Sequence, residues 1–187
     1  MADCKLGTKE FVFAGFGGQG VLFIGRVLSH AALERGVNTS FIPSYGPEMR
    51  GGTANCKVVV SDVEVGSPIV ETPDILVALN RPSLEKFEKT VRNGGLAIVN
   101  SSLIEGKVAR PEVKAAYIPC NDNAMEVGDS KVANLVAHGA YAALQCFFKL
   151  EDLETGIAEV VGAKRPEMLE INFKALRAGY EYAKNNL

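Results

Sequence analysis

Short apolar runs alternate along the first two thirds of the chain with stretches in which apolar residues recur every three or four positions. The runs have the length of buried strands and end at glycine, proline or asparagine. They predict strands at residues 10–16, 37–42, 55–61, 74–79, 96–99 and 115–118. Pro43 is expected to end the second strand, and 44–53 is expected to be a loop.

Helical spacing occupies two of the intervals between these runs. It predicts a helix over 21–35 that ends at Gly36, and a second helix that Asn80 caps. The last third of the chain has the pattern of helices throughout, at 130–148, 152–161 and 166–185. The alanines of the first of these allow a neighbouring element to approach closely.

Strands that alternate with helices predict right-handed crossovers and a mostly parallel sheet. The expected fold is α/β, a Rossmann-like three-layer helix–sheet–helix sandwich with additional C-terminal helices. We expect a single domain over 1–187, with 130–187 as its helical C-terminal part, which covers the sheet or packs on a partner.

Composition excludes several classes of protein. The 187 residues are 47% hydrophobic and 22% charged, with a formal net charge of -2, which is typical of a soluble globular domain without a basic field for nucleic acid or anionic lipid. We find no apolar stretch long enough for a membrane span and no secretory signal, so the expected location is cytoplasmic.

The cysteines and histidines do not predict a metal site. Cys4, Cys56, Cys120 and Cys146 contain no C-x-x-C pair, which argues against an iron–sulfur cluster or zinc site held by this chain alone. Cys56 and Cys146 lie in apolar runs and are expected to be buried. The two histidines, His30 and His138, lie in helical stretches, where core or surface roles are commoner than metal binding.

The first candidate site is the glycine-rich segment between the first strand and the first helix. Its sequence G-F-G-G-Q-G matches G-x-G-x-x-G, and the candidate ligand-binding residues are Gly15, Gly17, Gly18, Gln19 and Gly20. Glycines there let amide N–H groups approach an anion at the positive end of the helix dipole. The alternative is a tight turn that binds no ligand.

The second candidate segment, at 44–53, has turn chemistry mixed with charged and aromatic residues. Its candidate residues are Ser44, Tyr45, Gly46, Glu48, Arg50, Gly51 and Gly52. Arg50 can grip a phosphate or carboxylate with two hydrogen bonds, Glu48 can orient Arg50 or bond a ribose, and Tyr45 can stack on a base. The alternative is a well-ordered surface loop with an internal Glu48–Arg50 contact.

Residues that these two segments lack argue against NAD and against an ATPase-type phosphate loop. The second strand ends without the Asp or Glu that holds the ribose hydroxyls of NAD, and no Gly-Lys-Ser/Thr follows the glycines. Ligands of such sheets collect beyond the carboxyl ends of the strands, which places 15–20, 43–52, Asn80 and Asn100 along one edge. We can assemble no catalytic set and no metal site from the sequence, and Asn80 completes the candidate binding residues.

Three segments resemble the gamma subunit of 2-oxoacid:ferredoxin (acceptor) oxidoreductases. They are A-G-F-G-G-Q-G-V at 14–21, S-Y-G-P-E-M-R-G-G at 44–52 and P-D-I-L-V-A-L-N at 73–80. The resemblance covers about the first 150 residues in order and spacing, and the combination of the first two segments is far more specific than the bare glycine pattern. The chain is most similar to the 2-oxoglutarate or branched-chain 2-oxoacid type.

The resemblance implies a function within a larger enzyme. Such holoenzymes oxidatively decarboxylate a 2-oxoacid with coenzyme A, giving an acyl-CoA, carbon dioxide and reduced ferredoxin. Thiamine diphosphate is held by alpha and beta subunits, and iron–sulfur clusters by the beta subunit or a ferredoxin-like delta subunit. The gamma subunit is a Rossmann-like (domain III-like) chain implicated in coenzyme A binding and is not expected to be active alone.

Two other functions remain open from the residues alone. A free-standing dinucleotide-binding oxidoreductase would need a ribose-binding acid after the second strand. A nucleotide-sensing regulatory module would bind its ligand without thiamine-dependent partner subunits.

Overall fold

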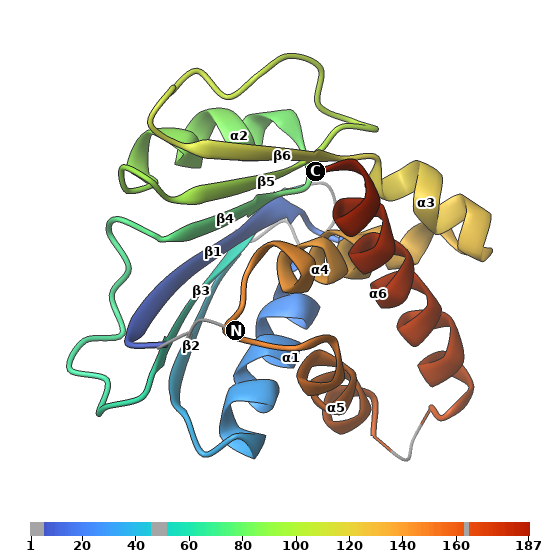
Figure 1. Cartoon of the computed structure of the whole chain (residues 1–187), viewed down its shortest axis with the longest axis horizontal. Coiled ribbons are helices and arrows are strands. Elements are labelled where there is room, and N and C mark those ends of the chain that lie inside the picture. The colour runs from blue at the N-terminus through green and yellow to red at the C-terminus, as the bar shows by residue number, and fades with distance from the viewer. Residues whose placement is uncertain (1–5, 46–51, 163–164) are drawn as a thin grey trace.

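The computed structural model describes residues 6–45, 52–162 and 165–187, which form one central sheet with helices on both faces (Figure 1). The sheet contains β1 (Thr8–Phe16), β2 (Asn38–Tyr45), β3 (Thr53–Ser61), β4 (Ile75–Ala78), β5 (Leu96–Asn100) and β6 (Lys114–Ile118). The order of the strands is β2-β3-β1-β4-β5-β6. β1, β4, β5 and β6 pair in parallel, whereas β3 lies antiparallel between β2 and β1. The expected α/β fold with a mostly parallel sheet is confirmed.

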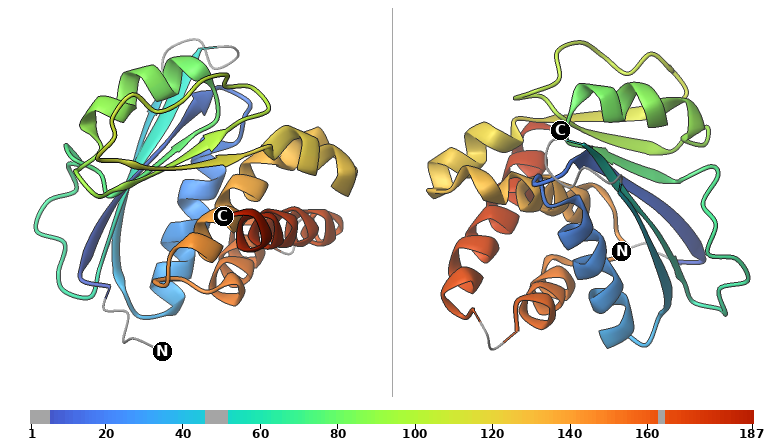
Figure 2. Two further views of the ribbon diagram at one scale, coloured as in Figure 1. Left: turned by 45° about the horizontal axis from the view of Figure 1, so that its top comes forward. Right: turned by 180° about the vertical axis from the view of Figure 1, so that it is seen from behind.

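The helices cover the two faces of the sheet unequally. They are α1 (Val21–Glu34), α2 (Arg81–Phe87), α3 (Cys120–Val127), α4 (Ala133–Leu144), α5 (Leu150–Val161) and α6 (Glu167–Asn186), with 3-10 turns at Glu88–Thr90 and Ser130–Val132. α1, α4, α5 and α6 gather on one side, and α2 lies on the other (Figure 2). Within the three described ranges, no helix combines the length and the apolar composition that crossing a bilayer requires.

The alternation of side chains along the strands divides the core between these two faces. Phe11 and Phe13 of β1 point into the larger cluster under α1, α4 and α6, while Val12 and Ala14 join the smaller cluster under α2. All four side chains are at most 1% exposed. β1 is therefore buried on both sides, and this fixes the position of the turn that follows it.

α4 and α6 approach each other closely because each places a glycine against the backbone of the other. A Cβ atom added at Gly139 would lie 1.8 Å from the carbonyl oxygen of Leu176, and one added at Gly179 would lie 1.9 Å from that of Val136. The close approach expected of the 130–148 helix is thus confirmed, and Gly139 and Gly179 are two positions that it requires to be free of side chains.

Four local expectations were wrong. β2 continues through Pro43 to Tyr45, because β2 is an edge strand, where a missing N–H is tolerated. α3 had not been expected, since its two buried residues, Cys120 and Ala124, make too short a pattern to recognise. The helix expected to end at 148 stops at Leu144, after which the chain turns, and Cys146 is exposed rather than buried.

Candidate functional site

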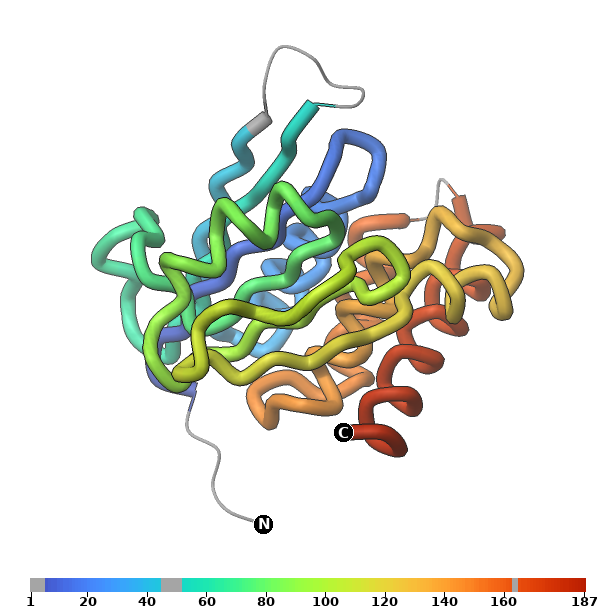
Figure 3. Tube along the Cα trace, turned by 90° about the horizontal axis from the view of Figure 1, so that it is seen from above, coloured from blue at the N-terminus to red at the C-terminus, as the bar shows by residue number. Residues whose placement is uncertain are grey.

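The register of the sheet brings the two candidate segments together. Phe16 at the end of β1 pairs with Thr53 at the start of β3, and Tyr45 at the end of β2 pairs with Ala54. The backbone amide of Gly17 donates a hydrogen bond of 2.8 Å to the carbonyl oxygen of Gly52. The ends of β2 and β3 consequently lie beside the turn after β1 (Figure 3).

The surroundings of three glycines in this turn explain differently why a glycine stands at each position. A Cβ atom at Gly15 would lie 2.8 Å from Oε1 of Gln19, and one at Gly20 would lie 2.3 Å from Nδ2 of Asn134. Gly20 also has φ 73° and Gly18 has φ 98°, both in the left-handed region that favours glycine. Gly18 is exposed, and a Cβ atom there would meet nothing within 4 Å. Gly15 and Gly20 are therefore required by packing, whereas Gly18 faces open space.

The amides of the turn divide into used and available donors. Gly17 donates to Gly52, and Gln19 donates to the carbonyl oxygen of Phe16 at 3.1 Å. No described residue accepts a hydrogen bond from the four remaining amides, those of Gly18, Gly20, Val21 and Leu22. α1 has neither a side-chain cap nor an acidic residue in its first turn. The positive end of its dipole is therefore uncompensated by described residues.

A cavity opens in front of these amides. Its volume is about 230 Å³, and it is lined by Phe16, Gly17, Gly18, Gly20, Val21, Leu22 and Ala54. Free donors around an open volume at a helix N-terminus are the arrangement in which proteins bind phosphate and carboxylate groups.

Hydrogen bonds of the Gln19 side chain, one of them to Asn80, hold the glycine turn in place. Oε1 of Gln19 accepts from the amide of Phe16 at 2.7 Å and from Nδ2 of Asn80 at 2.9 Å, while Nε2 of Gln19 donates to the carbonyl oxygen of Leu79 at 3.3 Å. Oδ1 of Asn80 accepts from the amide of Ser83 and caps α2, as the sequence predicted. Both oxygens and at least one proton of each side-chain amide are thus engaged with protein groups.

Asn100 extends this network to the end of β5. Its Nδ2 donates to the carbonyl oxygen of Leu79 at 3.3 Å and to Oδ1 of Asn121 at 2.8 Å, and its Oδ1 accepts from the amide of Cys120. Asn100 is 1% exposed. The expected alignment of the glycine turn, Asn80 and Asn100 along one edge of the sheet is confirmed.

Two residues of this edge escaped the sequence analysis. Lys131 and Asn134 line a second cavity of about 180 Å³, together with Gly18, Gln19, Leu79, Asn100, Asn121, Ser130 and Ala133. Nδ2 of Asn134 donates to the carbonyl oxygen of Gly20 at 3.1 Å across 114 positions of sequence. Lys131 is exposed and adds a cation beside the turn. No local sequence pattern indicates either residue as part of the site. Tertiary packing alone brings the 3-10 turn before α4 and the first turn of α4 to this edge.

The second candidate segment is described at its two ends. Ser44, which is exposed, and the backbone of Tyr45 close β2, and Gly52 precedes β3. Gly46, Glu48, Arg50 and Gly51 lie outside the described residues. Their assignment as ligand-binding residues stays a prediction.

The buried thiols and the buried imidazole are chemically quiet. Burial raises the pKa of the Cys56 thiol to about 12, and the pKa of Cys120 is raised for the same reason. Burial lowers the pKa of His138 to about 3, so the imidazole is neutral at physiological pH. Within the described parts of the chain, no cluster of three His, Cys, Asp or Glu side chains is placed to hold a metal ion.

The fold and this edge define a Rossmann-like α/β domain with a glycine-rich turn at the N-terminus of α1. Residues 10–182 match the family model described as pyruvate ferredoxin/flavodoxin oxidoreductase, and the chain belongs to this family.

Two curated relatives are both from Methanothermobacter thermautotrophicus. The ketoisovalerate oxidoreductase subunit VorA is 40% identical over 174 residues, which are 93% of this chain and 36% of VorA. The 2-oxoglutarate synthase subunit KorC is 38% identical over 180 residues, which are 92% of this chain and 94% of KorC. The chain thus spans about a third of the length of VorA and nearly all of KorC.

Two solved structures share the fold. The gamma subunit of a keto/oxoacid ferredoxin oxidoreductase from Geobacter sulfurreducens has a TM-score of 0.79 and 31% identity, over 94% of this chain and 98% of that one. A 2-oxoglutarate:ferredoxin oxidoreductase from Magnetococcus marinus, solved with 2-oxoglutarate, coenzyme A and succinyl-CoA bound, has a TM-score of 0.86 and 23% identity, over 97% of this chain and 32% of that one.

Proposed function

We propose that this chain is the gamma subunit of a cytoplasmic 2-oxoacid:ferredoxin oxidoreductase and that its glycine turn binds a phosphate of coenzyme A. The names of VorA, KorC and the Geobacter gamma subunit support the first part of the proposal. The substrate is 2-oxoglutarate or a branched-chain 2-oxoacid, and the alpha and beta subunits, with a delta subunit where present, hold thiamine diphosphate and the iron–sulfur clusters. The chain has no activity alone.

One observation carries the coenzyme A part of the proposal. The amides of Gly18, Gly20, Val21 and Leu22 have no acceptor among the described residues and surround a cavity of about 230 Å³. Because no acidic residue occupies the first turn of α1, a bound phosphate meets donors and a positive helix end without a competing carboxylate.

The other predicted site residues act in two ways in this proposal. Arg50 grips a second phosphate, Tyr45 or Glu48 positions the nucleotide, and the glycines at 46, 51 and 52 keep backbone close to the ligand. Gln19 and Asn80 are positioning residues, because their side chains are bonded to each other and to the protein backbone. Gly17 positions the turn through its bond to Gly52, so it is not one of the donors to the phosphate.

The two alternative functions make different demands. A free-standing NAD enzyme needs an acid at the end of β2, and the described end, Ser44 and Tyr45, provides none. A nucleotide-sensing module needs no partner subunits. Purification from the native host separates the three functions: co-purification of thiamine-binding chains supports our proposal, whereas an isolated chain with bound nucleotide contradicts it.

The coenzyme A contact is tested in the reconstituted complex with Arg50→Ala. Loss of one charge-assisted hydrogen bond, worth about 1.5–3 kcal/mol, raises the apparent KM for coenzyme A by about tenfold or more. Lys86→Ala is the matched control, since Lys86 lies on α2, against the ring of Phe87. An unchanged KM in Arg50→Ala removes Arg50 from the site.

A further inference from the structure

A pocket on the helical side of the molecule adjoins the glycine turn, since Gly20 also lines the cavity in front of the turn, but it extends away from the turn between the helices. Its volume is about 430 Å³, and it lies between α1, the start of α4, the end of α5 and the start of α6. Its walls are mostly apolar, with Phe23 from α1, Leu135 from α4, Val160 from α5 and Met168 from α6. The proposed coenzyme A site does not use these side chains.

Cations surround this pocket. Arg26, Lys131 and Arg165 belong to its described lining, which contains no carboxylate. All three are exposed, and none forms an ion pair with a described residue. Three positive charges from three separate segments of the chain around one apolar pocket leave a local charge that the described lining does not neutralise.

The side chain of Asn172 provides a second, independent indication of a ligand. Asn172 of α6 lines the pocket and is 5% exposed, yet its side chain forms no hydrogen bond with any described residue. Its amide atoms are not among the fully buried unpartnered atoms of the described residues, so they stay accessible and can bond a ligand. Asn134, the other buried amide of the lining, differs in that it bonds to Gly20.

We propose that this pocket binds a short-chain carboxylate, whose apolar chain lies against Phe23, Leu135, Val160 and Met168. The carboxylate group pairs with the cations, and Asn172 donates to one of its oxygens. Phosphorylated and other bulky dianions fit less well, because the walls are predominantly apolar. The volume falls within the range of about 300–1,000 Å³ that is typical of small-molecule sites.

The proposal is tested by titrating hexanoate into the full chain and following backbone amides by NMR. We expect saturable shifts in Phe23, Val160 and Met168. Acetate, which has the charge without the chain, and hexanol, which has the chain without the charge, are expected to bind at least about tenfold more weakly.

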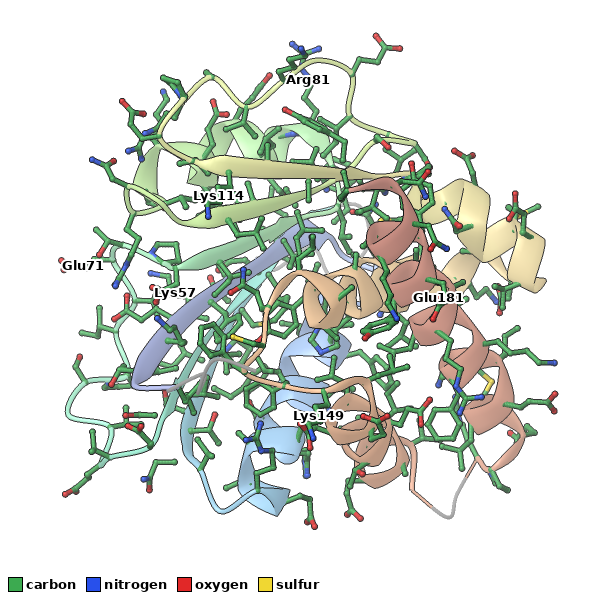
Figure 4. The ribbon with its side chains drawn as sticks, in the orientation of Figure 1. Lys57, Glu71, Arg81, Lys114, Lys149 and Glu181 are labelled. Atoms are coloured by element: carbon green, nitrogen blue, oxygen red, sulfur yellow. The ribbon has the colours of Figure 1, made fainter. Side chains whose placement is uncertain are left out.

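Variants separate the ionic from the structural contributions. Arg26→Gln is expected to weaken hexanoate binding about tenfold without lowering the thermal midpoint, because the side chain is exposed and unpaired among described residues. Arg81→Gln is the matched control, since Arg81 lies on α2, far from α5 and α6 (Figure 4). Asn172→Leu retains the volume of the side chain and removes its amide, so it is expected to weaken binding while the fold is kept.

Three results would overturn the assignment. The first is the absence of saturable shifts with hexanoate. The second is equal affinity of Arg26→Gln and Arg81→Gln. The third is displacement of hexanoate by coenzyme A, which would make the pocket part of the cofactor site. Failure of coenzyme A to bind at all would contradict the proposed function and leave the hexanoate result unaffected. The second result, combined with loss of subunit assembly in Arg26→Gln, would identify the pocket as a protein interface.

Discussion

Oε1 of Gln19 accepts a hydrogen bond of 2.9 Å from Nδ2 of Asn80, although 61 positions separate the two residues. The bond joins the glycine turn after β1 to the cap of α2 after β4, so it links the carboxyl ends of these two strands. Through the carbonyl oxygen of Leu79, the same network reaches Asn100 at the end of β5. Three parallel strands therefore fix the position of the turn whose amides we assign to phosphate.

We expect Gln19→Leu to destabilise the protein and to impair coenzyme A binding together. The leucine leaves the amide of Phe16 and Nδ2 of Asn80 without their acceptor, at a cost of about 1–3 kcal/mol in the free energy of unfolding. Urea denaturation measures this cost. A variant as stable as the wild type would show that the network does not hold the turn.

Gln19→Glu distinguishes positioning from electrostatics. The glutamate retains an acceptor for both donors but places a negative charge beside the proposed phosphate site. We expect a smaller loss of stability than in Gln19→Leu and a weakening of coenzyme A binding by about tenfold, from charge repulsion. Coenzyme A affinity that is equal in Gln19→Glu and the wild type would contradict an anion site at this turn.

The two left-handed glycines of the turn are expected to respond differently to alanine. Gly18→Ala costs the backbone strain alone, about 1–2 kcal/mol, because its Cβ atom meets open space. Gly20→Ala adds a clash with Nδ2 of Asn134, so it should cost about 1–3 kcal/mol more. Denaturant unfolding of both variants gives the difference directly.

A double-mutant cycle identifies the source of that difference. If Asn134 causes it, Gly20→Ala in an Asn134→Ala background costs about as much as Gly18→Ala. An additional cost that persists without the Asn134 side chain would refute the steric explanation.

The buried imidazole of His138 is expected to make the fold sensitive to acid. His138 is completely buried, and neither ring nitrogen has a hydrogen-bond partner among the described residues. Its folded pKa of about 3 lies below the unfolded value, so between these values the unfolded state binds the extra proton. Stability is therefore lost as pH falls from about 6.5 toward 3, by up to about 1.4 kcal/mol per pH unit.

His138→Leu tests this linkage. The leucine cannot take up a proton, so the variant should lose less stability than the wild type between pH 7 and pH 5. At pH 7 it should be at least as stable, because it removes unpaired polar atoms from the core. Urea unfolding at the two pH values measures both effects. Parallel pH profiles for the variant and the wild type would exclude His138 as the cause.

The sequence predicted those parts of the fold in which neighbouring residues carry the signal. The strand, glycine turn and helix at the N-terminal end, and the cap of α2 by Asn80, each depend on a few consecutive positions, and each is present. β2 was predicted too short, because the effect of Pro43 depends on whether its strand lies at an edge, and strand order is not a local property.

The candidate site was predicted in part for the same reason. Gly15, Gly18 and Gly20 follow from a motif, and their positions at the carboxyl edge follow from the parallel sheet. Lys131 and Asn134 meet the turn through the packing of α4, and no spacing in the sequence indicates this contact. Nor does a motif show that the amides of Gly17 and Gln19 are already used within the protein.

The contact between α4 and α6 should tolerate no side chain at its two glycines. A Cβ atom at Gly139 or Gly179 would lie within 2 Å of a backbone carbonyl oxygen of the other helix, and backbone cannot move aside as a flexible side chain can. We expect Gly139→Ala and Gly179→Ala each to cost at least about 3 kcal/mol in the free energy of unfolding, the upper end of overpacking penalties, because the helices must separate.

Gly66→Ala is the matched control: Gly66 is exposed, and its Cβ atom would meet nothing within 4 Å, so its cost should stay within about 0.5 kcal/mol. Thermal and urea unfolding of the three variants measure these costs. If Gly139→Ala were as stable as Gly66→Ala, the two helices would not be in backbone contact, and the wall that α4 and α6 form around the carboxylate pocket would have to be reconsidered.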